Sequence, residues 1–383
     1  MMDKRKWLNV LALLSFSLLV PGGPAFAQYS GDEAQDLITG ASDFNHVGNR
    51  SAEFLSIGVS ARAIALGGAY SAMADDITAL YWNPAGLGFL EGSEVFFTVV
   101  NMPLDGTLSY VGGGSSVLDG NAAVGAFIEV LNWGDLEVNT VDQPNGSGLF
   151  WGSFSFAGGV TWAQNFSDRF SAGVTVKGLH ESIYDVAGSA FAFDFGSNYH
   201  TTFRDRNVRL AFVVQNLGTS LMLQGSRLNI SVPPQDPYEE GSPLEDRNAE
   251  YRTTAFGVPN AFKAALSYDL IPKSWEAGHS WLVAGEFAQP NNQDATVSLG
   301  TEYNVRLGDE GSTTMVSGRG GWYIQQDELD LGNSPDGADI LRGLSLGGGF
   351  TYDFTDFAGT FDYAFRDKGR LGSEHYFSVK VGF

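Results

Sequence analysis

The stretch Ser373-Glu-His-Tyr-Phe-Ser-Val-Lys-Val-Gly-Phe383 alternates apolar side chains with small or polar ones. In a β-strand, successive side chains point to opposite faces of the sheet. One face of this strand therefore carries Phe377, Val379, Val381 and Phe383, and the other carries Tyr376, Ser378, Lys380 and Gly382. Such an apolar face is typical of the closing strand of a lipid-embedded barrel. A strand of a soluble sandwich alternates in the same way, so the stretch alone leaves both folds open.

The N-terminal residues favour export and so favour the barrel. Three basic residues at positions 4–6 precede an apolar run at 7–20, and Ala25-Phe26-Ala27 supplies a small-residue cleavage pattern. We predict that residues 1–27 are a Sec signal peptide. The apolar run is shorter than the roughly 20 residues that a spanning helix needs, which argues against an N-terminal anchor.

The composition restricts how the chain can cross a bilayer. Cysteine is absent, so neither a disulfide framework nor a thiolate metal site is available. The 49 glycines and 28 phenylalanines suit the tight walls and the aromatic girdles of barrels. The formal net charge of −22 argues against a nucleic-acid partner. Beyond the signal peptide, no apolar run reaches about 18 residues, which leaves a closed barrel as the means of crossing.

Stretches with period-two alternation recur along the chain, separated by Gly, Asn, Asp and Pro. They predict an all-β fold, a transmembrane outer-membrane β-barrel of about 14 antiparallel strands. Its partners would be outer-membrane lipid and the barrel-assembly machinery of a Gram-negative-type bacterium. An insertion signal for that machinery is expected at Tyr376, Val379, Val381 and Phe383. The expected strands are 93–101, 106–113, 121–131, 150–164, 169–184, 188–200, 207–217, 260–270, 279–288, 294–307, 312–324, 341–354, 356–367 and 374–383.

The lengths of the connections support this strand order. Long connections are expected at 132–149, 218–259 and 325–340, after strands three, seven and eleven. Short turns are expected at 165–168 and 308–311. Because all three long connections follow odd-numbered strands, they emerge on one side, as the outer loops of such barrels do.

Residues 54–90 do not have the pattern of a barrel wall. They are rich in small residues, with a short helical pattern at 77–81 that Asn83-Pro84 would end. Irregular backbone is tolerated inside a barrel only where protein or water satisfies its polar groups. We therefore predict a hatch or plug in the lumen at 54–90, preceded by a periplasmic segment at 28–53 and followed by the barrel at 91–383.

Several motifs of this segment resemble the N-terminal signature of the PorV/PorQ family, relatives of the FadL fatty-acid channels. They are Ala61-Arg-Ala63, Leu66-Gly-Gly-Ala-Tyr70, Ala74-Asp-Asp76 and Tyr81-Trp-Asn-Pro-Ala-Gly-Leu87, joined near the C-terminus by Phe361-Asp-Tyr-Ala-Phe365 and Leu371-Gly-Ser-Glu-His375. The resemblance implies a fourteen-stranded barrel with an N-terminal hatch. It marks as hatch residues Arg62, Gly67, Gly68, Asp75, Asp76, Trp82, Asn83 and Pro84.

Two functions follow from the resemblance. The first is a non-enzymatic role in protein export and surface attachment of the type IX secretion kind, with secreted cargo or secretion-system proteins as partners. The alternative is FadL-like passive transport of long-chain fatty acids or other hydrophobic compounds. Its apolar ligand contacts would be Phe54, Leu55, Ile57, Ile64 and Leu66. A barrel whose loops merely dock an extracellular partner is a third hypothesis.

Catalytic chemistry is weakly indicated, and neither a cofactor nor a metal site is predicted. The five histidines lack metal-ligand spacing. Acidic loops at 236–246 and 327–339 contain carboxylates for calcium without the spacing of a calcium loop, so solvated loops remain the alternative.

The charges expected inside the barrel have mixed signs, which favours internal ion pairs around a plug over a selective pore. Arg62 is expected to pair with Asp75 or Asp76, unless these carboxylates face lumen water. The other lumen-facing charges would be Lys177, Asp194, Lys263, Glu302, Asp353, Asp362, Arg366 and Lys380.

Overall fold

The computed structural model describes residues 50–103, 106–144, 146–232, 247–272, 278–307, 314–325, 342–354, 356–369 and 372–383. All of them belong to one compact unit. The predicted signal peptide, residues 28–49, both acidic loops and the turn at 308–311 lie outside the described residues. No helix in the described part of the chain is long and apolar enough to cross a bilayer.

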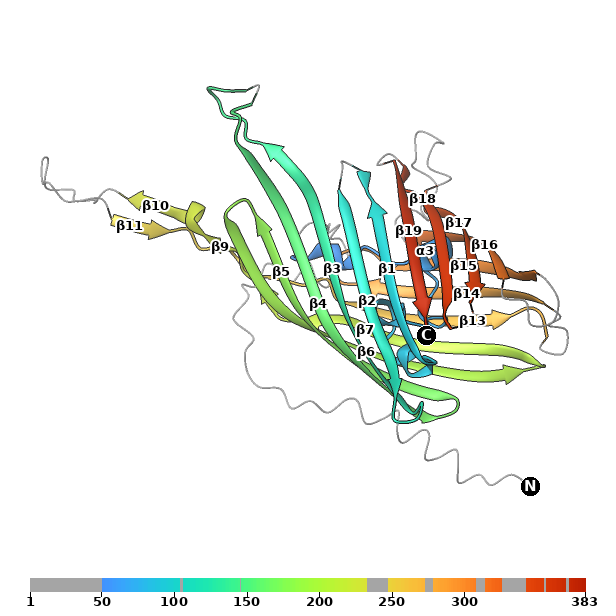
Figure 1. Cartoon of the computed structure of the whole chain (residues 1–383). Coiled ribbons are helices and arrows are strands. Elements are labelled where there is room, and N and C mark those ends of the chain that lie inside the picture. Colours follow the sequence, from blue (N-terminus) through green and yellow to red (C-terminus); the bar gives the residue numbers. More distant parts are fainter. Residues whose placement is uncertain are drawn as a thin grey trace, which may run out of the picture. The chain divides into compact units, whose positions relative to one another are not determined.

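Fourteen long strands of the described residues form one closed antiparallel barrel (Figure 1). They are β1 (Ser93–Asn101), β2 (Thr107–Val117), β3 (Ala122–Glu137), β4 (Phe150–Ser167), β5 (Phe170–Ile183), β6 (Val186–Phe203), β7 (Arg206–Gly218), β13 (Ala261–Asp269), β14 (His279–Pro290), β15 (Thr296–Leu307), β16 (Thr314–Gln325), β17 (Leu344–Asp353), β18 (Ala358–Asp367) and β19 (Ser373–Gly382). Each corresponds to one predicted strand, so the predicted fold class is confirmed.

The ring closes where the last strand meets the first. In Figure 1 the cyan strand β1 lies beside the red strand β19, with Phe97 paired to Val379 and Thr98 to Ser378. Around the ring, each strand pairs with its neighbour in the chain, and β7 pairs with β13 across the long connection. Closure leaves no barrel edge with unpaired backbone groups, which is the condition for a sheet to stand in lipid.

The two faces of the wall differ as the alternation predicts. On β19, Phe377 and Val379 are exposed, whereas Tyr376 and Ser378 are buried inside. Every strand contributes at least one large apolar side chain to an exposed outer belt. One from each strand, in chain order, is Phe97, Val111, Ile128, Val160, Val176, Phe193, Phe212, Phe262, Phe287, Leu299, Val316, Phe350, Phe361 and Val379.

The connections need two corrections. The predicted loop 132–149 begins later, because β3 continues to Glu137 past a register shift between Asn132 and Asp135. The connection after β7 contains short strands of its own, which local pairing forms within a long loop: β8 (Ser220–Leu221) with β12 (Phe256–Gly257), and β10 (Asn229–Val232) with β11 (Arg247–Glu250). It also holds β9 (Gln224–Gly225), which pairs with β6, and η4 (Ser226–Leu228). The long connections still follow strands three, seven and eleven.

Residues 54–90, here called the inner segment, form short helical pieces. These are η1 (Glu53–Ser56), α3 (Ala61–Ala65), α4 (Ala79–Trp82) and η2 (Pro84–Phe89). Gly67 and Gly68 have φ angles of 68° and 88°, a left-handed turn after α3 that glycine adopts without strain. Asn83 caps η2 by accepting from the Ala85 N–H, and Pro84 takes the first position, where a missing N–H costs nothing.

The inner segment lies within the ring of strands. Helix α3 contacts β16 to β19, while η2 contacts β3 to β6 on another part of the ring. Its apolar side chains, including Ile64, Leu66 and Leu80, are buried. A function as a plug remains a prediction that this placement supports.

Candidate functional site

A network of buried ion pairs joins the inner segment to the wall. The Arg62 Nε and Nη2 atoms each donate to a Glu302 carboxylate oxygen at 2.8 Å. Glu302 also accepts from Arg319 Nε at 2.6 Å, and Arg319 Nη1 donates to Asp362 at 2.5 Å. The Glu302 side chain is 1% exposed. Because both of its oxygens hold charged donors, this one carboxylate compensates two guanidinium groups.

Asp76 forms a second connection to the wall. Its Oδ2 accepts from Lys380 Nζ at 2.6 Å and lies 3.9 Å from Arg62 Nη1. Burial by itself raises the pKa of Asp76, but the charges of Lys380 and Arg62 outweigh it and hold the pKa well below the ordinary value of 3.8. The expected pairing of Arg62 with Asp76 is confirmed. Asp75 is half-buried and makes no ion pair with any described residue.

The Asp76 pair predicts a specific pH dependence of stability. A carboxyl whose pKa is lower folded than unfolded stabilises the fold above the unfolded pKa, and this contribution disappears as pH falls through the folded pKa. We expect Asp76→Asn to lower the free energy of unfolding by about 1–3 kcal/mol at pH 7. The difference from wild type should be constant from pH 8 to about 5 and shrink below about pH 4. The temperature at which each barrel unfolds, followed across pH by its heat-dependent shift in migration on gels, checks this prediction. A stability difference that stays constant down to pH 2 contradicts it.

Three aromatic and polar residues of α4 and its cap organise the interior. Trp82 Nε1 donates to the Val59 carbonyl at 2.8 Å, and the Tyr81 hydroxyl lies 2.9 Å from the Leu55 and Ile57 carbonyl oxygens. Asn83 Nδ2 donates to the Ser71 carbonyl at 2.9 Å. These bonds satisfy backbone groups that a helical ladder leaves free. Tyr81, Trp82 and Asn83 therefore have structural roles within the inner segment.

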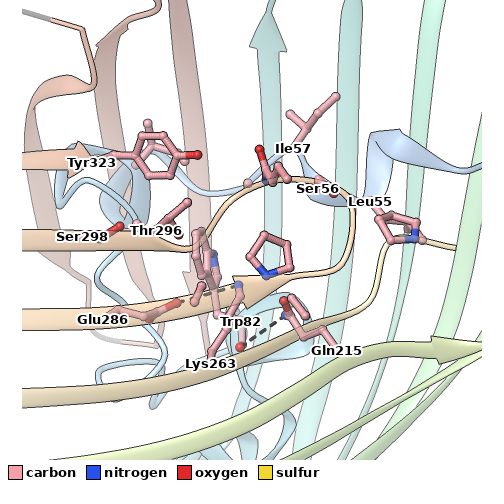
Figure 2. A pocket seen from close by; sticks show the side chains of 18 of the residues that line it. Leu55, Ser56, Ile57, Trp82, Gln215, Lys263, Glu286, Thr296, Ser298 and Tyr323 are labelled. Atoms are coloured by element: carbon pink, nitrogen blue, oxygen red, sulfur yellow. Dashed lines mark hydrogen bonds and ion pairs between the residues drawn. The ribbon is translucent and has the colours of Figure 1, made fainter. Parts of the chain in front are cut away.

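A cavity of about 280 Å³ lies between the inner segment and the wall. Figure 2 shows that Leu55, Ile57 and Trp82 of the inner segment face residues of β7, β13, β14 and β15 across it. Leu55, Ile57 and Ile64 line the cavity as predicted for apolar ligand contacts. Phe54 and Leu66 do not, because they are buried in the packing of the inner segment.

The wall side of the cavity carries polar side chains beside small apolar ones such as Ala261 and Ala288. It is lined by Gln215, Lys263, Glu286, Thr296 and Ser298. Glu286 Oε2 accepts from the N–H groups of Tyr70 at 3.1 Å and Ser71 at 2.9 Å. The wall residue thus supplies an acceptor that the backbone of the inner segment requires, which is the physical reason for a carboxylate here.

Close approach of backbone to backbone fits the inner segment to the wall. A Cβ on Gly67 would lie 2.7 Å from Trp322 N, and one on Gly321 would lie 2.1 Å from Leu66 C. Pro84 is seated against Gly173 and Gly196 of β5 and β6 in the same way. Glycines on both sides thus allow the inner segment to lie directly against the wall, and the wall glycines were not anticipated from the sequence.

The structure differs from the predicted lumen charges in one residue and adds others. Asp353 is exposed, because it is the last residue of β17. Lys177 pairs with Asp194 at 2.7 Å and Arg366 with Glu374 at 2.6 Å. Glu286, Arg319 and Glu374 were missed, although period-two alternation places them on the inner face of their strands. Their partners depend on which strands meet around the ring.

Comparisons with known proteins bear on the fold. No family model matches the chain. No curated protein matches it either. A solved toluene transporter of Ralstonia pickettii, TbuX, is similar with a TM-score of 0.50 and 13% identity, over 85% of this chain and 97% of that chain. The chain has the fold of an outer-membrane β-barrel.

Two further solved structures match at the same level of identity. The toluene transporter TodX of Pseudomonas putida has a TM-score of 0.49 at 11% identity, over 85% of this chain and 97% of that one. A FadL homologue of Pseudomonas aeruginosa has a TM-score of 0.47 at 12% identity, over 85% and 98%. Nothing in these comparisons supports the PorV/PorQ resemblance specifically.

Proposed function

We propose that this chain is a non-enzymatic outer-membrane barrel that lets small hydrophobic or amphipathic molecules pass beside the inner segment. The observation that carries the proposal is the cavity of about 280 Å³ between that segment and the wall. Ligand sites are typically concave, largely preformed and lined by apolar side chains with a few placed polar groups. Leu55, Ile57, Ile64 and Trp82 provide the apolar part of this lining.

The outer belt supports the membrane location. Large apolar side chains are exposed on all fourteen strands. Soluble monomers rarely expose a contiguous apolar patch above a few hundred Å². A continuous belt around a closed barrel costs too much free energy in water, and in lipid it costs nothing.

A discontinuity in the wall supports an exit for the passing molecule. The pairing of β6 with β7 shifts register between Phe193 and Phe195. Opposite this shift, Gln215 and Asn216 of β7 line the cavity. A register shift takes groups out of the backbone ladder, and here the Asn216 N–H donates to the Asp194 side chain at 2.7 Å instead. We therefore take this shift, where the wall depends on side-chain bonds, as the candidate exit.

The names of the fold neighbours agree with passage of hydrophobic compounds, since two are toluene transporters and one is a FadL homologue. The export hypothesis is not carried forward, because no comparison favours it.

Flux through the purified barrel in liposomes tests the proposal. We expect toluene, a small hydrophobic molecule, to equilibrate faster with barrel-containing liposomes than with empty ones. Ala288→Trp, which fills the cavity, should reduce this flux about tenfold, because it removes the volume that the passing molecule needs. Val297→Trp on the outer face serves as control, since Val297 is exposed. Flux equal to that of empty liposomes, or unchanged in Ala288→Trp, contradicts the proposal.

A further inference from the structure

The polar wall of the cavity spans three neighbouring strands. Lys263 on β13 pairs across the sheet with Ala288 on β14, and Ala288 pairs with Thr296 on β15. One step along, Glu286 pairs with Ser298. The small Ala288 side chain leaves room between Lys263 and Thr296, so that charged and hydroxyl groups surround an open space.

The opposite side of the same cavity is apolar. Ile57, Ile64 and Trp82 of the inner segment line it, and Figure 2 shows Trp82 close to Lys263 and Glu286. The Lys263 ammonium lies 4.9 Å from the centroid of the Trp82 ring. A molecule in this space would therefore meet an apolar surface on one side and hydrogen-bonding groups on the other.

Of the two lysines that line this cavity, Lys263 is the more buried, and it makes no hydrogen bond to a described residue. Its Nζ lies 3.8 Å from Glu286 Oε1, beyond hydrogen-bond distance. No described residue supplies a hydrogen-bond acceptor to it. The Lys263 side chain is only 12% exposed. A nearly buried ammonium without acceptors is unfavourable, and a ligand that brings an acceptor removes this cost.

The other cations of the cavity are either hydrogen-bonded or open to water. Arg366 donates to Glu374 at 2.6 Å and to the Tyr376 hydroxyl at 2.9 Å. Lys368 Nζ lies 3.7 Å from Glu374 Oε1, also beyond hydrogen-bond distance, but its side chain is 38% exposed, so water solvates its charge. Glu286 receives the two N–H groups of Tyr70 and Ser71, so its charge is partly compensated by backbone and not by Lys263 alone. Lys263 is left as the group available to a ligand.

We propose that the cavity binds compact amphipathic anions, namely single-ring molecules that carry a carboxylate. This inference rests on the proposed function and narrows its substrate class. Lys263 binds the carboxylate, the hydroxyls of Thr296 and Ser298 offer further donors, and the ring lies against Trp82. The volume of about 280 Å³ sets the size, because cavities for drug-sized ligands begin at roughly 300 Å³. A long alkyl chain does not fit within it, whereas one ring with its carboxylate does.

Equilibrium binding to the full-length barrel in detergent tests this inference, with benzoate, benzyl alcohol and toluene as probes of one shape and different polarity. Benzoate should bind more tightly than toluene. Lys263→Met should weaken benzoate about 10- to 100-fold, the expected loss of a charge-assisted hydrogen bond, and change toluene less than about twofold. Lys263→Arg should retain most of the benzoate affinity. Arg204→Gln, at an exposed turn, is the matched control and should change nothing.

A second variant guards against a fold defect in Lys263→Met. Glu286→Gln keeps an oxygen for the Tyr70 and Ser71 N–H groups and removes the competing charge, so benzoate should bind several-fold more tightly. Each variant is first shown to be folded by its heat-dependent shift in migration on gels. The inference is overturned if the wild type binds benzoate and toluene equally. It is also overturned if folded Lys263→Met and Glu286→Gln bind benzoate with unchanged affinity. If toluene passes but benzoate does not bind, the anion-binding inference is wrong and the proposed function stands. If benzoate binds but no molecule passes, the proposed function is wrong and the binding site stands.

Discussion

Replacing Glu302 by alanine is expected to detach one side of the inner segment and to lower the free energy of unfolding by about 3–5 kcal/mol. Glu302 is 1% exposed and holds Arg62 and Arg319 at 2.8 and 2.6 Å. Without the negative charge of Glu302, the positive charges of both guanidinium groups are incompletely compensated in a region of low dielectric. Asp362 still serves Arg319, and Asp76 at 3.9 Å is a weak substitute for Arg62.

Urea titration of the barrel in lipid vesicles measures the stability change, and conductance across a planar bilayer reports whether the lumen opens. We expect higher conductance in Glu302→Ala, because an inner segment without its anchor no longer fills the lumen. Asp353→Ala is the control, since Asp353 is exposed at the end of β17. Unchanged stability in Glu302→Ala would falsify the view that this carboxylate anchors the inner segment.

Adding a single methyl group at Gly321 is the second large effect. A Cβ there would lie 2.1 Å from Leu66 C and 2.2 Å from Gly67 N, both backbone atoms of the inner segment. Backbone cannot rotate away as a side chain can, so the whole turn after α3 must move. We expect Gly321→Ala to cost about 1–3 kcal/mol, the usual range for overpacking, and to raise conductance.

Gly318→Ala is a closely matched control for this change. It adds the same methyl group to the same strand three residues earlier, where no atom lies within 4 Å of the new Cβ. The two glycines lie on opposite faces of β16, and only the methyl group at Gly321 meets the inner segment, so a loss of stability confined to Gly321→Ala reports that contact. If both variants unfold at the same urea concentration and conduct equally, the close approach of Gly321 to the turn does not contribute to stability.

Much of the barrel was predictable because its pattern is local. Each strand repeats with period two, and a strand such as Leu344–Asp353 places Leu346 and Phe350 outward whatever its neighbours are. The long connections after strands three, seven and eleven also predicted which end of the barrel carries the long loops. The extension of β3 to Glu137 escaped prediction because it depends on a register shift with β4.

The candidate site was less predictable because it joins residues far apart in sequence. Arg62 was expected to pair with Asp75 or Asp76, and it lies 3.9 Å from Asp76. Its stronger partner Glu302, 240 residues away, was not identified. Glu286 was missed for the same reason. The period-two pattern predicted that these charged side chains point into the barrel, but it did not predict which of them lie in contact.

The amino-acid sequence by itself determined the class of fold, the number of strands and the two faces of the wall, because alternation and turn residues act within a few positions. The tertiary structure decided that Glu302 joins Arg62 to Arg319 and that Lys263 lies beside Trp82 without an acceptor from the described residues. Those contacts follow from ring closure, which brings together strands and an inner segment separated by up to hundreds of residues. Their energies depend on burial, and burial exists only once the barrel is closed around the inner segment.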